Sequence, residues 1–153
     1  MSGLDYTVRH TATAYSNAVS VIFQGVTSAA CPITINRIEL QSAVTTSSQA
    51  VVVIQWGIYT GAAHAAGTPV TPKALAPKNT LSSATAWRIA SATLGTTFAV
   101  YKEWQWNIAL PFDHVLGMPS LKIEVPAATV WALVLPAAAG TPTFSGSVDY
   151  TEY

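Results

Sequence analysis

The side chains best suited to chemistry are concentrated in the stretch EWQWNIALPFDH, Glu103 to His114, which combines two tryptophans, a phenylalanine, two acids and a histidine. Alternate residues of a strand share a face, so Trp104 and Trp106 would point the same way. Two adjacent indoles can form a platform for a sugar ring or an unpaired base, and they can equally fill a core or a subunit interface. Because no basic groove is indicated nearby, we favour packing and keep a sugar platform as the alternative.

Asp113 and His114 are an aspartate and a histidine, the residue types that accompany the nucleophile in many catalytic triads. A triad also needs a nucleophile, and neither a GxSxG elbow nor a reactive-cysteine motif occurs in the chain. The pair follows Pro111 and Phe112, which indicates a loop. We therefore expect Asp113 and His114 to form an exposed loop pair joined by a hydrogen bond.

Paired carboxylates could support glycoside hydrolysis if two of them faced each other across a cleft, about 5 to 10 Å apart. Glu39, Glu103 and Glu124 are the acids expected near the middle of strands, and each has at least one apolar neighbour in the sequence. That alternation places each acid on the outward face of its strand. Solvated strand faces account for these acids, so no catalytic residue is predicted.

Ligands for a metal or a nucleotide are dispersed. His10, His64 and His114 stand in separate segments without HxH or HxxxH spacing, and Cys31 is the single cysteine. The glycines form neither a GxGxxG nor a phosphate-binding-loop pattern. We expect no metal, no cofactor and no intramolecular disulfide, with Cys31 buried as a small apolar residue. The chain is predicted not to be an enzyme.

Charge is scarce, and this is the most informative feature of the composition. Only 9% of the 153 residues are charged, against about 25% in ordinary soluble domains. The seven basic residues form no run, so neither a nucleic acid nor a membrane surface is an expected partner. The start of the chain lacks the pattern of a secretory signal, so we expect it to stay in the cytosol of the cell that makes it. Wide uncharged surfaces favour association with other proteins.

Short runs of β-branched and aromatic residues, separated by clusters of Gly, Pro, Asn and Ser, predict an all-β fold. Eight or nine strands in a single domain, residues 1–153, indicate a two-sheet antiparallel sandwich that is jelly-roll-like. The expected strands are residues 6–15, 18–26, 33–40, 49–59, 86–93, 98–108, 121–125, 129–135 and 144–150.

Two of these strands carry extra information. In residues 33–40 the apolar alternation shifts phase at Asn36 and Arg37, which predicts a β-bulge. Residues 49–59 are apolar on both faces, which indicates a central strand. The three tryptophans outside the opening stretch lie inside apolar strands and are predicted to be core residues: Trp56, Trp87 and Trp131.

Two segments are longer than the sandwich itself requires. Residues 60–81 are rich in Ala, Thr and Pro, and Pro69, Pro72 and Pro77 should prevent regular pairing, so we expect a long loop. Residues 1–15 are expected to be an interaction arm. We predict that both segments reach neighbouring proteins. The predicted interaction residues are Ala66, Val70, Ala74, Trp104 and Trp106.

The order of elements resembles small β-sandwich structural proteins of tailed bacteriophage particles. The segments that carry the resemblance are ITINRIELQSA (33–43), VVVIQWGIYTGAAHAAGTPVTPKAL (51–75), WQWNIALPFDHV (104–115) and FSGSVDYTEY (144–153). In that family a long strand is followed by a Thr/Gly/Pro-rich loop, a Trp-Asn strand that leads to a Pro-containing loop, and a last strand with acidic residues.

The resemblance implies a virion structural role, as a capsid decoration or cement protein or another minor head component. It further implies a homo-oligomer, usually a trimer, that binds the lattice of the major capsid protein at the capsid surface. No catalytic residues come with that family. A carbohydrate-binding or host-recognition module that uses Trp104 and Trp106 is the alternative function.

Overall fold

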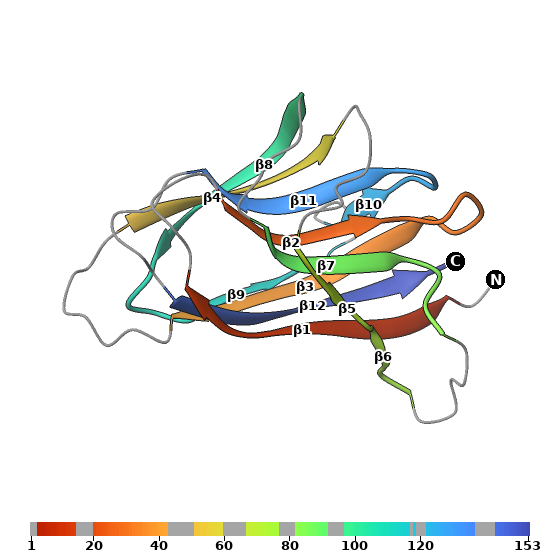
Figure 1. Cartoon of the computed structure of the whole chain (residues 1–153), viewed down its shortest axis with the longest axis horizontal. Helices are drawn as coiled ribbons and strands as arrows, with labels where there is room; N and C mark the ends of the chain where they lie inside the picture. Colours follow the sequence, from red (N-terminus) through yellow and green to blue (C-terminus); the bar gives the residue numbers. More distant parts are fainter. Residues whose placement is uncertain are drawn as a thin grey trace.

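A computed structural model of the chain confirms the all-β class, with two antiparallel sheets packed together (Figure 1). The structure describes residues 3–14, 20–42, 51–59, 67–76, 82–91, 97–116, 118, 122–136 and 143–153. The strands are β1 (Leu4–Ala14), β2 (Ser20–Val26), β3 (Ile33–Ser42), β4 (Val51–Tyr59), β5 (Thr68–Val70), β6 (Lys73–Ala74), β7 (Ala86–Ser91), β8 (Phe98–Asn107), β9 (Phe112–Val115), β10 (Ile123–Val125), β11 (Val130–Leu135) and β12 (Thr143–Glu152).

The strand order is that of a jelly roll. Sheet A has the order β10-β3-β12-β1-β6, with β9 also paired to β3, and sheet B has the order β5-β7-β2-β11-β4-β8. In a jelly roll the first strand pairs with the last, the second with the second-to-last, and so on toward the middle of the chain. The strands follow this rule when β9 and β10 are counted as one interrupted strand and the strands β5, β6 and β7 are left out. The pairs are β1 with β12, β2 with β11, β3 with β9 and β10, and β4 with β8. The predicted jelly-roll-like sandwich is therefore confirmed.

The predicted number of strands, eight or nine, is too low, because the described residues form 12. Each of the nine expected stretches contains a strand, and β5, β6 and β9 are additional. These three strands have only two to four residues and pair on one side. Such short edge strands do not carry enough apolar periodicity to be recognised in the sequence.

The expected long loop over residues 60–81 is partly strand. β5 pairs with β7 and β6 pairs with β1, so the chain crosses here from the edge of sheet B to the edge of sheet A (Figure 1). Pro69 lies inside β5 because an edge strand can leave one side without hydrogen bonds, where the missing N–H of proline is harmless. We call residues 67–76 the strap. Ala66, one of the predicted contact residues, lies outside the described residues.

The expected interaction arm over residues 1–15 is instead, from Leu4 to Ala14, a full strand of sheet A. β1 pairs with β12 along its length, with Leu4 opposite Glu152 at one end. Tyr6 and Val8 of β1 are 1% and 0% exposed in the core. Releasing this strand to reach a partner would expose these side chains, so the expectation of a free arm is wrong for the described part of the segment.

The bulge predicted at Asn36 and Arg37 is confirmed. The pairing of β12 with β3 passes from Arg37 directly to Ile35, which leaves Asn36 as an extra residue. β9 and β10 pair with β3 on either side of this position, and the Leu116 N–H donates to the Asn36 carbonyl at 2.8 Å. The extra residue allows Ile35 and Ile38, an odd number of positions apart, both to face the core.

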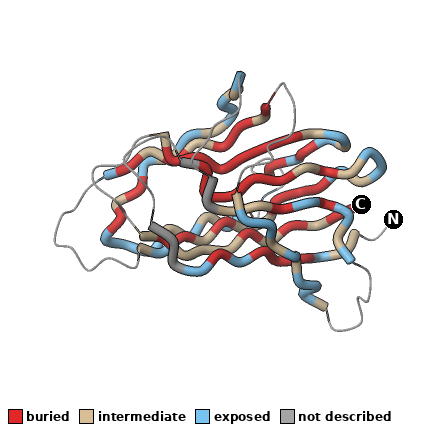
Figure 2. The backbone as a smooth tube through the Cα atoms, viewed as in Figure 1, coloured by how far each residue is buried: buried red, intermediate tan, exposed pale blue. Residues whose placement is uncertain are grey.

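The main core lies between the inward faces of the two sheets, where buried positions follow one another along the strands (Figure 2). Trp56, Trp87 and Trp131 are 4%, 2% and 1% exposed, which confirms them as core residues. The rings of Trp87 and Trp131 meet edge to face with centroids 4.7 Å apart, an arrangement that aromatic pairs prefer. Cys31 is half-buried rather than buried, because it lies in the connection between β2 and β3.

A second apolar cluster lies on the opposite face of sheet B. Val130, Ala132 and Val134 of β11 belong to it, whereas the alternate residues of the same strand belong to the main core. Tyr59 of β4 joins this cluster at 4% exposure. β4 is paired on both sides, with β11 and β8, which confirms that the two-sided apolar run marks an interior strand.

A buried carboxylate connects the two sheets. Glu152 of β12 is 6% exposed and accepts hydrogen bonds from the Ser83 hydroxyl at 2.5 Å and from the N–H groups of Ala84 and Thr85 at 3.0 and 2.8 Å. The three donors directly precede β7 of sheet B. Burial alone would raise the pKa of Glu152, but these hydrogen bonds outweigh it and lower the pKa below its ordinary value of 4.5.

We predict that Glu152→Gln lowers the free energy of unfolding at neutral pH by about 1–3 kcal/mol, because the carboxylate is a stronger acceptor than the amide. A carboxylate with a lowered pKa stabilises the fold above its ordinary pKa, and this contribution is lost as the pH falls through the lowered value. The difference between wild type and variant should therefore be full at neutral pH and shrink below pH 4.5.

Urea unfolding at neutral and acidic pH measures this difference. Glu124→Gln, on an exposed position of β10, is the matched control and should change little. A Glu152→Gln variant as stable as this control at neutral pH would contradict the role assigned to Glu152.

Candidate functional site

Trp104 and Trp106 share one face of β8, as predicted, and this face is turned toward the core, opposite Ile54 and Val52 of β4. Trp106 is 3% exposed, and its indole N–H donates to the Leu110 carbonyl at 2.7 Å. Trp104 is half-buried and packs against the same core. A sugar platform needs exposed ring faces, so the geometry supports packing and not the platform.

Asp113 and His114 are not the loop pair that we expected from the sequence. Both lie in β9, where neighbouring residues point to opposite faces. The ring of His114 lies 5.1 Å from that of Trp104, whereas the Asp113 carboxylate accepts hydrogen bonds from Arg37 at 3.0 and 2.8 Å. Burial lowers the pKa of His114, and the charge of Lys102 lowers it further. The prediction was wrong because pairing with β3 makes this segment a strand.

The register of sheet A aligns polar residues of four strands in one row on its outer face. Arg9 of β1 stands opposite Ser147 of β12, Ser147 stands opposite Glu39 of β3, and Glu39 stands opposite Asp113 of β9. Their neighbours along the strands, such as Val8 and Val148, fill the core, so the row faces outward.

Arg37 holds the acidic end of this row in place. Its guanidinium donates to Asp113 and lies 2.5 Å from one oxygen of Glu39, while the Ser147 hydroxyl donates to the other oxygen at 2.7 Å. The hydrogen bond from Arg37 lowers the pKa of Asp113. The Arg37, Glu39 and Asp113 side chains are 39–46% exposed, so these ion pairs contribute little to stability, and their main effect is to orient the carboxylates.

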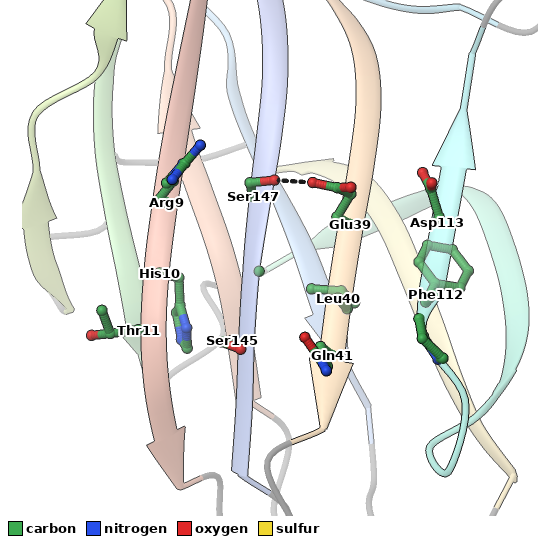
Figure 3. Close-up of a pocket in the computed structure, with 12 residues that line it drawn as sticks. Arg9, His10, Thr11, Glu39, Leu40, Gln41, Phe112, Asp113, Ser145 and Ser147 are labelled. Carbon is green, nitrogen blue, oxygen red and sulfur yellow. Dashed lines mark hydrogen bonds between the residues drawn. The ribbon is translucent and has the colours of Figure 1, made fainter.

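A groove of about 640 Å³ runs over the row (Figure 3). β12 lies between β1 and β3, so the short residues Ser145, Gly146 and Ser147 form its floor. Arg9 stands on the β1 side and Gln41 on the β3 side. None of these residues was predicted as a site. The available signal was the run SGS inside an otherwise bulky strand, but only the register shows which side chains flank it.

The predicted contact residues of the strap differ in their surroundings. Ala74 is exposed, whereas Val70 is half-buried and packs against the main core. Glu103 and Glu124 are exposed on outward strand positions, as predicted. His64 lies outside the described residues.

Within the described ranges, no group of three or more His, Cys, Asp and Glu side chains is placed to hold a metal ion. The same ranges contain no helix with the length and hydropathy that a membrane crossing requires.

Exposed apolar side chains gather along one margin of the sandwich, formed by β8 and β9. Eight large apolar residues of the described chain are 47–66% exposed. Five of them lie on β8, on β9 or within three residues of these strands, and we call them the apolar margin: Val100, Tyr101, Leu110, Val115 and Met118. β8 is also the last strand of sheet B. Lys102 and Glu103, in the middle of β8, are the kind of residues that discourage uncontrolled strand pairing at such an edge.

Comparisons of the chain with protein-family models, with curated proteins and with solved structures found no match.

We predict that Trp106→Ala lowers the free energy of unfolding by about 3–5 kcal/mol, because it removes a buried indole and leaves a cavity. Trp104→Ala should have a smaller effect, because the Trp104 side chain is already partly in contact with water. Urea unfolding followed by circular dichroism measures both losses. Equal losses of stability, or a larger loss for Trp104→Ala, would contradict the placement of Trp106 inside the core and of Trp104 at its border.

Proposed function

We propose that this chain is a non-enzymatic structural protein that binds and stabilises a bacteriophage capsid, as a decoration, cement or minor head protein. The jelly roll supports this proposal, because viral structural proteins commonly use that architecture. The segments that resemble phage-particle proteins include β3, β4, β5, β6 and β9, the end of β8 and nearly all of β12, which form much of the sandwich. A subunit that repeats on a lattice gains strength from many weak contacts, so it needs no single strong site.

The apolar margin is the observation that carries the proposal. Tyr101 and Leu110 are 63% and 61% exposed on a chain with few charges to keep its surfaces apart. Burial of this margin against a second copy would remove apolar surface from water at about 25 cal/mol per Å². A closed arrangement of copies would cover the margin of every copy, and the resemblance to phage-particle proteins favours three copies over two. We therefore propose a homotrimer.

The strap is the segment that we propose to contact the major capsid protein at the capsid surface. It lies at the opposite margin from β8 and β9, where it joins the edge of sheet B to the edge of sheet A. Ala74 and Leu75 are exposed there, and Leu75 is 50% exposed. Val70 is not suited to a test of this contact, because a charge at Val70 would disturb the core against which it packs.

We predict that light scattering after size exclusion gives a mass three times the 16.1 kDa of one chain. Tyr101→Asp and Leu110→Asp should each reduce this mass toward that of one chain, because they place charges in a contact that would otherwise exclude water. Leu75→Asp is the matched control at the opposite margin, and it should keep the trimer but weaken cosedimentation with phage heads that lack this protein.

A monomeric wild type at micromolar concentrations would overturn the trimer. If Leu75→Asp loses the trimer and Tyr101→Asp keeps it, the copies contact each other through the strap and not through the apolar margin. Thermal unfolding of each variant distinguishes loss of assembly from loss of the fold.

A further inference from the structure

We propose that the groove on the outer face of sheet A binds a neutral saccharide. This activity goes beyond lattice binding. The groove is centred on β12 of sheet A, and only its β9 side, at Pro111 and Asp113, adjoins the apolar margin. It also uses residues other than the two tryptophans first considered for a sugar.

The shape of the groove follows from the side chains of three neighbouring strands. Ser145, Gly146 and Ser147 leave a low floor along β12, and longer side chains rise from β1 and β3 on either side (Figure 3). At Gly146, β12 approaches β3 so closely that an added Cβ would meet the backbone carbonyl of Glu39. The volume, about 640 Å³, lies within the roughly 300–1,000 Å³ typical of small-molecule sites.

Three groups that line the groove have no side-chain partner in the part of the chain that the structure describes. Among the described residues, neither the Arg9 guanidinium, nor the Gln41 amide, nor the Ser145 hydroxyl makes a hydrogen bond or ion pair to another side chain. Arg9 can only donate, whereas Gln41 and Ser145 can both donate and accept. The groups come from β1, β3 and β12, so a ligand in the groove would be held from both sides and from below.

The acceptors of the groove are already oriented. Glu39 is held by the Ser147 hydroxyl and by Arg37, and Asp113 is held by the two hydrogen bonds from Arg37. Each carboxylate has about four lone-pair positions, so both can still accept hydrogen bonds from a ligand. Because these side chains are fixed before binding, less conformational entropy is lost when a ligand arrives.

The distribution of charge selects the class of ligand. A cationic ligand would face Arg9, and an anionic ligand would face Glu39 and Asp113 at the other side. Sugar hydroxyls both donate and accept, so a neutral saccharide can pair with the carboxylates, the guanidinium and the amide at the same time. Pro111 is exposed and lines the groove just before β9, where it adds an apolar surface against which the C–H face of a sugar ring can pack.

The test is binding of the purified full-length protein to an array of neutral gluco-, galacto- and manno-oligosaccharides, with sialylated and uronate-containing glycans on the same array. We expect binding to a subset of the neutral glycans, with the affinity then measured by titration calorimetry. Arg9→Ala and Gln41→Ala should each weaken binding about tenfold, and Ser145→Tyr should abolish it by filling the floor. Gln105→Ala, the same amide removed from an exposed position of β8, is the matched control and should bind as the wild type does.

Absence of binding to every neutral oligosaccharide would overturn the proposal. Binding restricted to the acidic glycans would overturn the neutral class of ligand. Thermal unfolding shows whether Arg9→Ala, Gln41→Ala and Ser145→Tyr are folded. If all three variants are folded and still bind, the ligand binds elsewhere on the protein and the proposed site is wrong.

Discussion

The pairing of β12 with β1 on one side and β3 on the other is the constraint on which the rest of the structure depends. Because side chains alternate along a strand, the register of β12 decides both which of its side chains enter the core and which face outward. Val148 and Tyr150 enter the core, while Ser145 and Ser147 line the outer face. A slip of one residue would exchange these two sets, so the core and the groove cannot be altered independently. The same strand ends in Glu152, whose carboxylate holds the segment before β7.

The few charges of the chain are not spread evenly. The outer face of sheet A carries a row of polar residues in which Arg37 links Glu39 and Asp113, and alternate positions of that sheet fill the core. The opposite face of sheet B carries a buried apolar cluster around Ala132, and the β8–β9 side carries exposed apolar residues such as Tyr101. The surfaces proposed for self-association, for the capsid and for a saccharide are therefore chemically different, and the saccharide groove meets the apolar margin only along β9.

Local patterns predicted much of the fold because each depends on only a few neighbouring residues. Alternation and β-branched runs indicated every long strand, and the phase shift at Asn36 indicated the bulge that β12 and β3 form. The same reasoning missed β5, β6 and β9, because strands of two to four residues at a sheet edge have no periodicity to recognise. It also treated the prolines of the strap as barriers to pairing, although an edge strand accommodates Pro69.

The sequence by itself determined the all-β class, the core tryptophans Trp56, Trp87 and Trp131, and the outward placement of the strand acids, since these follow from alternation along one segment. Only the tertiary structure decided that Asp113 bonds to Arg37 rather than to His114, and that Trp106 is enclosed. It also decided that Arg9, Ser147 and Glu39 form one row. These relations join residues far apart in the chain, and they depend on strand register, which the pairing of whole strands sets and no local pattern specifies.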